Sequence, residues 1–337
     1  VKVSKEDHRT RTKLPKVSFC IPAYKPNYFE ETLQSVCNQS YPNAEIIITD
    51  DDESGRIEKI VKNFKASSPF EIRYFKNPQR LGGLLNCTKV VKLATGEYIK
   101  YIYDDDLYEP DLTRELVWHM EGFGSGVSLA VCARDLVSQT GKPLPDNPTV
   151  VPVTKCNSLL LGKELIDSIM TTTVNTLGEP MAALFRKADL DDLDSFFIAK
   201  GEDYVGNLDL VLFIRLLSKG NCIYLPKRMV HLRQHPSQET WSDEAKFQIH
   251  YAWYPMLRFA RDKGFLQNPS HYKQAIMKVS ELLYYFLINN ANKLNSEQLA
   301  QIESAIGWMC DQAKKINADP SIAYYSQQPV YTDFYNT

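Results

Sequence analysis

Three consecutive aspartates, Asp104, Asp105 and Asp106, directly follow a run of residues that alternate as in a strand (96–103). Carboxylate oxygens are the ligands that Mg²⁺ and Mn²⁺ prefer, and these ions typically bind one or two protein carboxylates together with substrate phosphates. In open α/β sheets, ligands bind where strands end. The pattern therefore indicates a site for a divalent cation and a nucleotide diphosphate; its alternative is an acidic turn exposed to solvent.

An alternation of strand and helix patterns predicts the open α/β sheet that would position this site. A second acidic cluster, Asp50, Asp51 and Asp52, follows an almost wholly apolar run (44–49), as expected of a parallel strand covered on both faces. The order of the patterns is that of a sheet built from βαβ units. The expected strands are 17–21, 44–49, 70–75 and 96–103, and the expected helices are 28–38, 57–64 and 82–93.

The remainder of the chain is less regular and becomes helical. The sequence predicts strands at 128–137, 181–185 and 222–225, a surface loop at 141–154, and helices at 159–170, 208–218, 245–262, 272–290 and 296–316. Asp209 lies near the start of helix 208–218, where the helix dipole favours a negative charge. We expect a basic arm at 1–15, an α/β domain at 16–240, a helical C-terminal region at 241–317 and a tail at 318–337.

The composition of the chain limits the classes of partner that it can bind. The net charge of -2 gives the chain no field for gathering nucleic acid, and the seven cysteines include no CxxC pair, which favours reduced thiols in a cytoplasmic protein. No apolar run approaches the ~20 residues that a membrane helix needs, so we expect a soluble protein. The basic arm is interpreted as disordered; its alternatives are a linker in a longer polypeptide and a peripheral contact with an anionic membrane surface. We interpret the aromatic-rich tail as docking on a surface, with disorder as the alternative, and no feature indicates an oligomeric state.

Short motifs, in order along the chain, resemble those of the inverting glycosyltransferases of family 2, which have the nucleotide-sugar transferase fold called GT-A. The motifs are VSFCIPAY (17–24), QSYP (39–42), EIIITDD (45–51), Asn77 with Gly82 and Asn86, ATGEY (94–98) and DDD (104–106), with looser matches at GEP (178–180), Asp209 and RQH (233–235). The resemblance ends near residue 240. A pair that is often Gly-Ser in the family is Asp52-Glu53 here.

The metal motif also departs from the family pattern. Many members have Asp-x-Asp at a fixed distance before a proline, and counting back from Pro110 puts Tyr103 in the first position. The resemblance then implies that Asp105 is the main metal ligand. It places Asp104 on the ribose or on a metal-bound water and Asp106 in a supporting position.

The resemblance implies a nucleotide site made of Pro22, Tyr24, Asp51, Arg80 and Asp104. Asp51 would accept a hydrogen bond from the N3–H of uracil or thymine, and the Tyr24 ring would stack on that base. Arg80 would reach the base or the phosphates. The alternatives are a helix cap for Asp51, loop packing for Tyr24 and a solvated side chain for Arg80.

Asp209 is the expected catalytic base, which would take the proton of the acceptor hydroxyl as that oxygen attacks the anomeric carbon. Its alternatives are an N-cap role and replacement by Asp203 as the base. Glu179 and Arg233 would contact the acceptor or donor sugar, Arg233 could also close over the diphosphate, and His235 would complete the metal shell as a neutral imidazole. The alternatives are a turn without chemistry for Glu179 and exposed loop positions for the other two.

The resemblance, together with these residues, implies an inverting, Mn²⁺- or Mg²⁺-dependent hexosyltransferase in the cytoplasm or at the inner face of the membrane. It would move a sugar from a UDP- or dTDP-sugar to a hydroxyl of a glycan or lipid-linked glycan. The alternative is a nucleotide-sugar-binding module without catalysis. A Rossmann-type oxidoreductase would need GxGxxG after the first strand, where the chain has PAYKP (22–26) instead.

Overall fold

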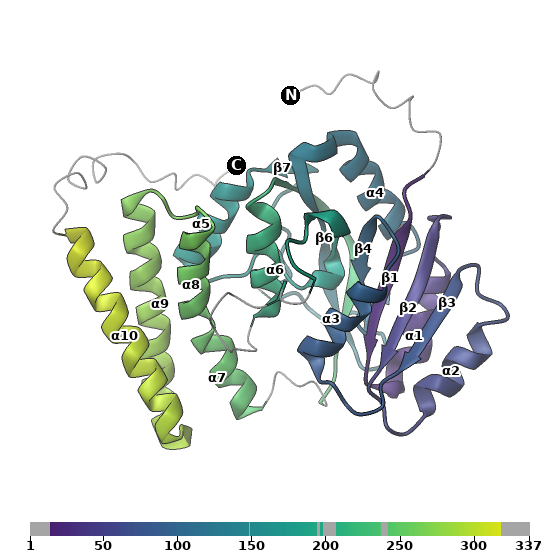
Figure 1. Cartoon of the computed structure of the whole chain (residues 1–337), viewed down its shortest axis with the longest axis horizontal. Coiled ribbons are helices and arrows are strands. Elements are labelled where there is room, and N and C mark those ends of the chain that lie inside the picture. The colour runs from purple at the N-terminus through teal and green to yellow at the C-terminus, as the bar shows by residue number, and fades with distance from the viewer. Residues whose placement is uncertain (1–13, 148, 194–195, 198–206, 237–241, 318–337) are drawn as a thin grey trace. The chain divides into compact units, whose positions relative to one another are not determined.

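The computed structural model describes residues 14–147, 149–193, 196–197, 207–236 and 242–317 (Figure 1). The described residues fall into two compact units. The first unit includes those within 14–162, 175–197 and 208–236, and the second includes those within 163–174, 207 and 242–317. Residues 1–13 of the predicted arm and the whole predicted tail lie outside the described residues.

A single mixed sheet forms the centre of the first unit. Its strands are β1 (Val17–Ala23), β2 (Ala44–Asp50), β3 (Glu71–Lys76), β4 (Tyr98–Tyr101), β5 (Leu107–Tyr108), β6 (Val127–Ser138), β7 (Ser158–Leu160), β8 (Ala183–Arg186) and β9 (Asn221–Gln234). The strand order is β3-β2-β1-β4-β8-β6-β9-β5, with β7 paired to β9. The helices of the chain are α1 (Pro26–Cys37), α2 (Arg56–Phe64), α3 (Gly83–Leu93), α4 (Leu112–Phe123), α5 (Gly162–Thr172), α6 (Leu208–Leu217), α7 (Asp243–Tyr251), α8 (Trp253–Asp262), α9 (Pro269–Asn290) and α10 (Ser296–Asn317).

The strand order creates a switch point between β1 and β4. Strands β3, β2, β1 and β4 pair in parallel, and the chain moves outward from β1 to β3 before it returns to β4 on the other side of β1. Right-handed crossovers then place α1 and α2 on one face and α3 on the other. Accordingly, α1 contacts α2, whereas α3 packs against β1 and β2 (Figure 1). The carboxyl ends of β1 and β4, where this order reverses, are the usual ligand position in such sheets.

Beyond β4 the sheet is mixed, and β9 is longer than the sequence predicts. Strand β8 pairs antiparallel with β4 and β6, and β6 pairs in parallel with β9. The predicted strand end at Leu225 is wrong, because the register shift that pairs Leu225 with Cys132 and Arg228 with Ala133 accommodates Pro226 in a bulge. The strand consequently runs to Gln234, and its residue His231 pairs with Leu107, which directly follows the acidic loop formed by Asp104, Asp105 and Asp106.

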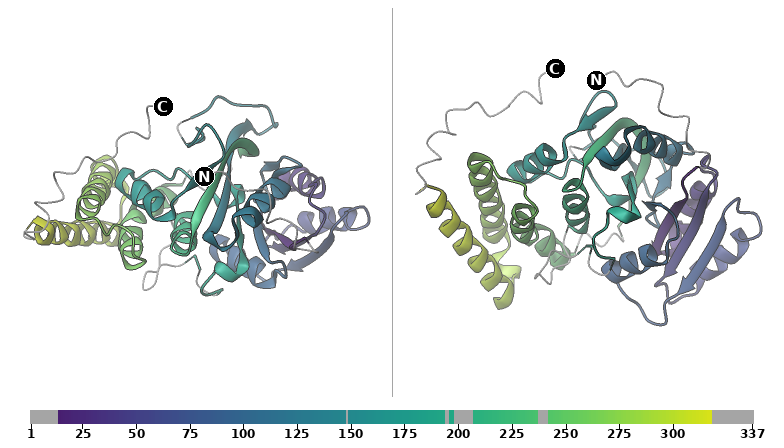
Figure 2. Two further views of the ribbon diagram at one scale, coloured as in Figure 1. Left: turned by 90° about the horizontal axis from the view of Figure 1, so that it is seen from above. Right: turned by 45° about the horizontal axis from the view of Figure 1, so that its top comes forward.

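Helices make up the second unit. Helix α9 packs against α7, α8 and α10, and Figure 2 shows α10, in yellow, beside α9. The predicted helix 245–262 is two helices separated at Ala252, because Pro255 has no N–H to donate to the Tyr251 carbonyl. The predicted helix start at Leu159 is also wrong, because Leu159 pairs with Ile223 in the sheet of the first unit. Among the described helices, none has the length and apolar character needed to cross a membrane.

Candidate active site

Asp51 is held in one orientation after the end of β2. Its Oδ1 accepts hydrogen bonds from the side-chain amide of Asn77 at 2.6 Å and from the backbone amide of Leu81 at 3.0 Å. Its Oδ2 accepts from the backbone amide of Gly82 at 2.9 Å. These donors, from the loop between β3 and α3, fix the carboxylate and leave Oδ2 with capacity for a further hydrogen bond. That geometry suits a ring N–H of a nucleotide base.

Asp52, the next residue, caps α2. Its Oδ1 accepts from the Ser54 backbone at 3.1 Å, and its Oδ2 accepts from the backbone amides of Arg56 at 3.1 Å and Ile57 at 3.4 Å. Burial raises the pKa of Asp52, but these hydrogen bonds outweigh it and leave the pKa below its usual value. The helix-cap role considered for Asp51 therefore belongs to Asp52.

Tyr24 and Arg80 form a flat polar-aromatic surface near Asp51. The guanidinium carbon of Arg80 lies 4.0 Å from the centroid of the Tyr24 ring, and Tyr24 is 37% exposed. Pro22 lies in β1, where it pairs with Thr49 of β2. An exposed ring with a guanidinium over its face is suited to stacking on a base.

Asp104 connects the acidic loop, by hydrogen bonds, with the residues that follow β1. Its Oδ2 accepts hydrogen bonds from the backbone amides of Tyr24 and Lys25, each at 2.6 Å. Burial and the charge of Asp105 raise the pKa of Asp104 to about 7, while the two amides act in the opposite direction. The loop between β1 and α1 and the loop after β4 therefore form one structure at the switch point.

Asp105 and His235 lie together at the end of the sheet. His235 Nε2 is 3.0 Å from Asp105 Oδ2, and the Lys25 ammonium is 3.7 Å from the same oxygen. His235 is buried, and its ring centroid is 4.9 Å from that of Tyr28. The structure thus brings together a carboxylate and an imidazole, the two ligand types expected for a divalent cation.

Arg233 is buried rather than exposed in a loop. It lies near the end of β9, and its side chain is 0% exposed. The guanidinium donates to the carbonyls of Asp105 at 2.8 Å and Gln139 at 2.9 Å and pairs with Glu31 at 2.8 Å. The alternative considered for Arg233, an exposed loop position, is therefore wrong. A fully buried guanidinium offers no surface to a sugar, and its contacts hold the backbone of Asp105 instead.

Asp106 joins the acidic loop to two other elements. Its Oδ1 accepts from the backbone amide of Arg233 at 2.9 Å, and its carbonyl accepts from the Thr32 hydroxyl of α1 at 2.8 Å. Burial and the charge of Asp105 raise the pKa of Asp106 well above its usual value. Through these bonds Asp106 supports the position of Asp105.

Asp209 lies in the first turn of α6, where Asn175 and Glu179 surround its carboxylate. Its Oδ2 accepts a hydrogen bond from the side-chain amide of Asn175 at 2.5 Å. Burial, followed by the negative charge of Glu179, raises the pKa of Asp209 to about 7. A carboxylate with this pKa can act as a general base near neutral pH.

Tyr103 directly precedes the aspartates 104–106 in the chain. After burial, which is the largest cause, the charges of Asp209, Glu179 and Asp106 all raise the pKa of Tyr103. Asp209 and the aspartates 104–106 both belong to the first unit.

Comparison with known proteins identifies the family. Residues 18–193 match the family model described as glycosyl transferase family 2. The chain belongs to glycosyltransferase family 2. An uncharacterized glycosyltransferase of Rickettsia felis is 30% identical over 165 residues, which are 47% of this chain and 26% of the relative. TuaG of Bacillus subtilis, a glycosyltransferase whose assigned but unproven role is in teichuronic acid biosynthesis, is 26% identical over 48% of this chain and 68% of its own length.

Solved structures confirm the GT-A fold that the motifs predict. Residues 1–349 of S. aureus TarS in complex with UDP-GlcNAc align with a TM-score of 0.66 and 16% identity, covering 90% of this chain and 83% of that chain. The mannosyltransferase PcManGT of Pyrobaculum calidifontis, solved with GDP-Man and Mn²⁺, aligns with a TM-score of 0.51 and 14% identity, covering 93% and 85%. At these identities the likeness concerns the fold.

The described residues of this family 2 chain provide a partial ligand set for a metal ion. Within them, no group of three or more His, Cys, Asp or Glu side chains is arranged to hold a metal. Asp105 and His235 are two ligands of types that Mn²⁺ accepts, and such ions commonly take their other ligands from phosphates and water. The pair therefore fits a cation that binds together with a diphosphate. The contacts of Asp106 favour a supporting role over direct ligation.

Glu179 owes its position to an arginine that the sequence analysis did not single out. Arg134 of β6 is 4% exposed, and its Nε lies 2.8 Å from Glu179 Oε2. The guanidinium also donates to the Leu177 and Thr149 carbonyls at 3.3 and 2.8 Å. No local pattern could reveal this pair, because only the pairing of β6 with β8 and β9 brings Arg134 to the turn that carries Glu179.

Replacing Gly178 with alanine should destabilise this turn. Gly178 has φ +82°, and an added Cβ would lie 2.0 Å from the Arg134 guanidinium carbon. Strain and displacement of a buried guanidinium together should lower the free energy of unfolding by about 2–4 kcal/mol, as measured by urea denaturation. Gly307→Ala, in α10 with nothing within 4 Å of the added Cβ, is the matched control and should be neutral or stabilising. Equal stability of the two variants would contradict the packing described here.

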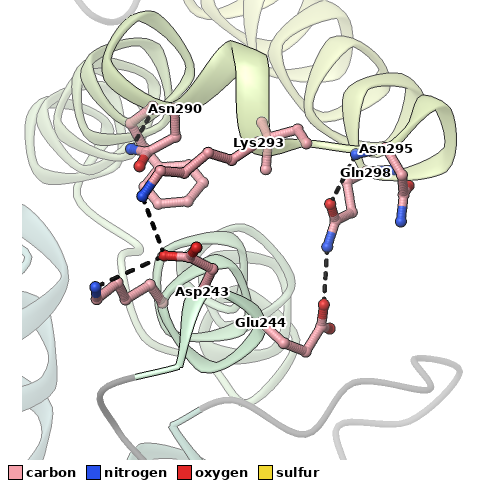
Figure 3. Close-up of a pocket in the computed structure, with 9 residues that line it drawn as sticks. Asp243, Glu244, Asn290, Lys293, Asn295 and Gln298 are labelled. Atoms are coloured by element: carbon pink, nitrogen blue, oxygen red, sulfur yellow. Dashed lines mark hydrogen bonds and ion pairs between the residues drawn. The ribbon is translucent and has the colours of Figure 1, made fainter.

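Asp203, the rival base, is outside the described residues. The pocket in Figure 3 belongs to the second unit and contains none of the predicted site residues. Its polar side chains bind one another: Lys293 lies 3.3 Å from Asp243, and Gln298 donates to Glu244 at 2.9 Å.

Proposed function

We propose that this chain transfers a hexose from a UDP- or dTDP-sugar to a hydroxyl group of a glycan or lipid-linked glycan, with inversion at the anomeric carbon. The single observation that carries the proposal is the presence of three chemical features in the first unit. They are the oriented carboxylate of Asp51, the Asp105–His235 pair and the Asp209 carboxylate with its raised pKa. A nucleotide-sugar transferase needs a base pocket, a diphosphate site and a proton acceptor. Asp51, the Asp105–His235 pair and Asp209 are suited to these three tasks, in that order.

In the proposed reaction Asp209 removes the proton of the acceptor hydroxyl while that oxygen attacks the anomeric carbon. A bond forms between the acceptor oxygen and the anomeric carbon, and the bond from that carbon to the β-phosphate oxygen breaks. The electron pair of the broken bond leaves with the nucleoside diphosphate. Asp209 then releases its proton to solvent.

Asp105 and His235 would hold Mn²⁺ or Mg²⁺, which neutralises charge on a diphosphate leaving group when it is bound. Asp104 contributes by fixing the backbone of Tyr24 and Lys25 beside this pair. Arg233 contributes by holding the Asp105 carbonyl from inside the protein. Hydrogen bonds from inside the protein therefore hold the backbone around Asp105, which favours a preorganised site.

The proposed donor and acceptor rest on the chemistry of Asp51 and on two similar proteins, TarS and TuaG. Asp51 offers an acceptor for the N3–H of a pyrimidine base, and the complex of TarS contains UDP-GlcNAc. The assigned role of TuaG supports a surface polysaccharide as acceptor. The chain spans only 26% of the length of the Rickettsia felis relative. The donor and the acceptor of the whole protein are therefore proposals.

A donor screen tests the proposal. We expect UDP- or dTDP-sugars to raise the melting temperature of the protein in the presence of Mn²⁺, with a smaller rise in its absence, and to release nucleoside diphosphate when an acceptor is added. GDP-sugars serve as the comparison. Binding without release across all acceptors tried would favour a binding module, and absence of any metal-dependent binding of a nucleoside diphosphate would overturn the proposal.

A further inference from the structure

Lys25 occupies an unusual place beside the candidate metal ligands. It immediately precedes α1, and its backbone is fixed because its amide donates to Asp104 Oδ2 at 2.6 Å. Its ammonium lies 3.7 Å from Asp105 Oδ2, the same oxygen that lies 3.0 Å from His235 Nε2. A lysine therefore neutralises the oxygen that a metal ion would use.

A metal ion and the Lys25 ammonium compete for this oxygen. A divalent cation binds a carboxylate oxygen at about 2.0–2.2 Å, which would bring two positive charges close to the ammonium. The side chain of Lys25 is 22% exposed, and that of Asp105 is 13% exposed. Water therefore screens the repulsion only in part. In the absence of an anion, the lysine should weaken binding of the cation.

A bound diphosphate should turn the repulsion between Lys25 and the cation into a favourable arrangement. Its oxygens carry negative charge that can bind the cation and the ammonium at once, so that both cations gain a partner instead of repelling each other. When the donor's anomeric bond breaks, the leaving diphosphate gains a further negative charge, which a nearby ammonium stabilises. Lys25 is thus placed to favour the state in which cation and diphosphate are bound together.

We infer that Lys25 couples metal binding to donor binding: it opposes the cation in the free protein and joins the cation in binding the diphosphate of the donor. The inference rests on the proposed function, because it needs a nucleoside diphosphate as ligand. The observations that carry it are the shared oxygen of Asp105 and the fixed backbone of Lys25. A loose, partly exposed ion pair contributes little to stability, so Lys25→Met should fold normally.

The test measures Mn²⁺ affinity by electron paramagnetic resonance, with and without UDP. In the wild type we expect weak binding of Mn²⁺ alone and much tighter binding with UDP, and by linkage UDP should bind more tightly with Mn²⁺. Lys25→Met should bind Mn²⁺ alone on the order of tenfold more tightly than the wild type, while its affinity for UDP falls on the order of tenfold. Lys25→Arg should keep the wild-type behaviour, and Lys62→Met, which removes an exposed lysine paired with Glu58 on α2, is the matched control.

The outcomes separate this inference from the proposed function. If the wild type binds UDP with Mn²⁺ but Lys25→Met leaves the affinity for Mn²⁺ alone unchanged or weaker, the coupling role is wrong and the proposed function stands. If Lys25→Met loses uridine affinity as much as UDP affinity, the substitution damages the base pocket and the inference also fails. If the wild type binds no nucleoside diphosphate under any condition, the proposed function itself is overturned.

Discussion

Replacing Asp209 with asparagine should abolish sugar transfer while leaving donor binding intact. Asparagine has nearly the same shape and can still accept the hydrogen bond from Asn175, but it cannot take a proton from the acceptor hydroxyl. Loss of a general base typically costs 10²–10⁴ in rate, so we expect kcat to fall about 10³-fold. Initial rates of nucleotide release and calorimetric titration with UDP measure the two quantities.

The pH dependence of transfer provides a second readout for Asp209. Because the carboxylate is the active form and its pKa is about 7, the rate should rise about tenfold per pH unit below 7 and level off above it. Glu179→Gln removes the neighbouring negative charge that raises this pKa, so it should move the rise to lower pH. The wild type should lose some stability as pH increases from about 4 to 7, since the raised pKa favours the protonated form in the folded state. Asp209→Asn should remove that component.

Controls separate the base role from damage to the fold. Asp311→Asn, at an exposed aspartate of α10, should leave both transfer and its pH profile unchanged. If Asp209→Asn weakens UDP binding as much as it slows transfer, Asp209 is part of the donor site and another group acts as the base.

The parts of the site that depend on local sequence could be predicted. Asp51 and Asp104 each follow an apolar or alternating strand, and such strands must end at the same edge of a parallel sheet. The positions of these acids therefore follow from hydrophobic periodicity. Because divalent cations prefer carboxylate ligands, a cation site near these aspartates can be predicted without knowledge of the fold.

The parts that depend on distant pairing could not be predicted. Arg233 is polar and follows Pro226, so the sequence favours a loop, yet the bulge in β9 carries it into the core beside Asp105. Arg134 reaches Glu179 only because β6 lies between β8 and β9 in the sheet. In both cases a buried arginine pairs with a glutamate far away along the chain, and local patterns contain no signal for such pairs.

Replacing Asp105 with asparagine should have the largest effect on donor binding. Asparagine keeps one oxygen but removes the charge that attracts a divalent cation, so Mn²⁺ should no longer strengthen UDP binding. Altering even the supporting residues of a metal site costs 10–100-fold in affinity, and we expect a loss of about 100-fold for UDP in the presence of Mn²⁺. Titration with UDP, with and without Mn²⁺, measures this difference.

We expect a different step to be affected by each of three substitutions, Asp105→Asn, Lys25→Met and Asp209→Asn. That difference is the strongest test of the site. Asp105→Asn should weaken Mn²⁺ binding both with and without UDP, whereas Lys25→Met should strengthen it without UDP, although both side chains approach the same oxygen. Asp209→Asn should leave both affinities unchanged, because its carboxylate is bound by Asn175 rather than by the acidic loop. Retention of Mn²⁺-dependent UDP binding by Asp105→Asn would move the metal to other ligands, with Asp106 as the next residue to replace.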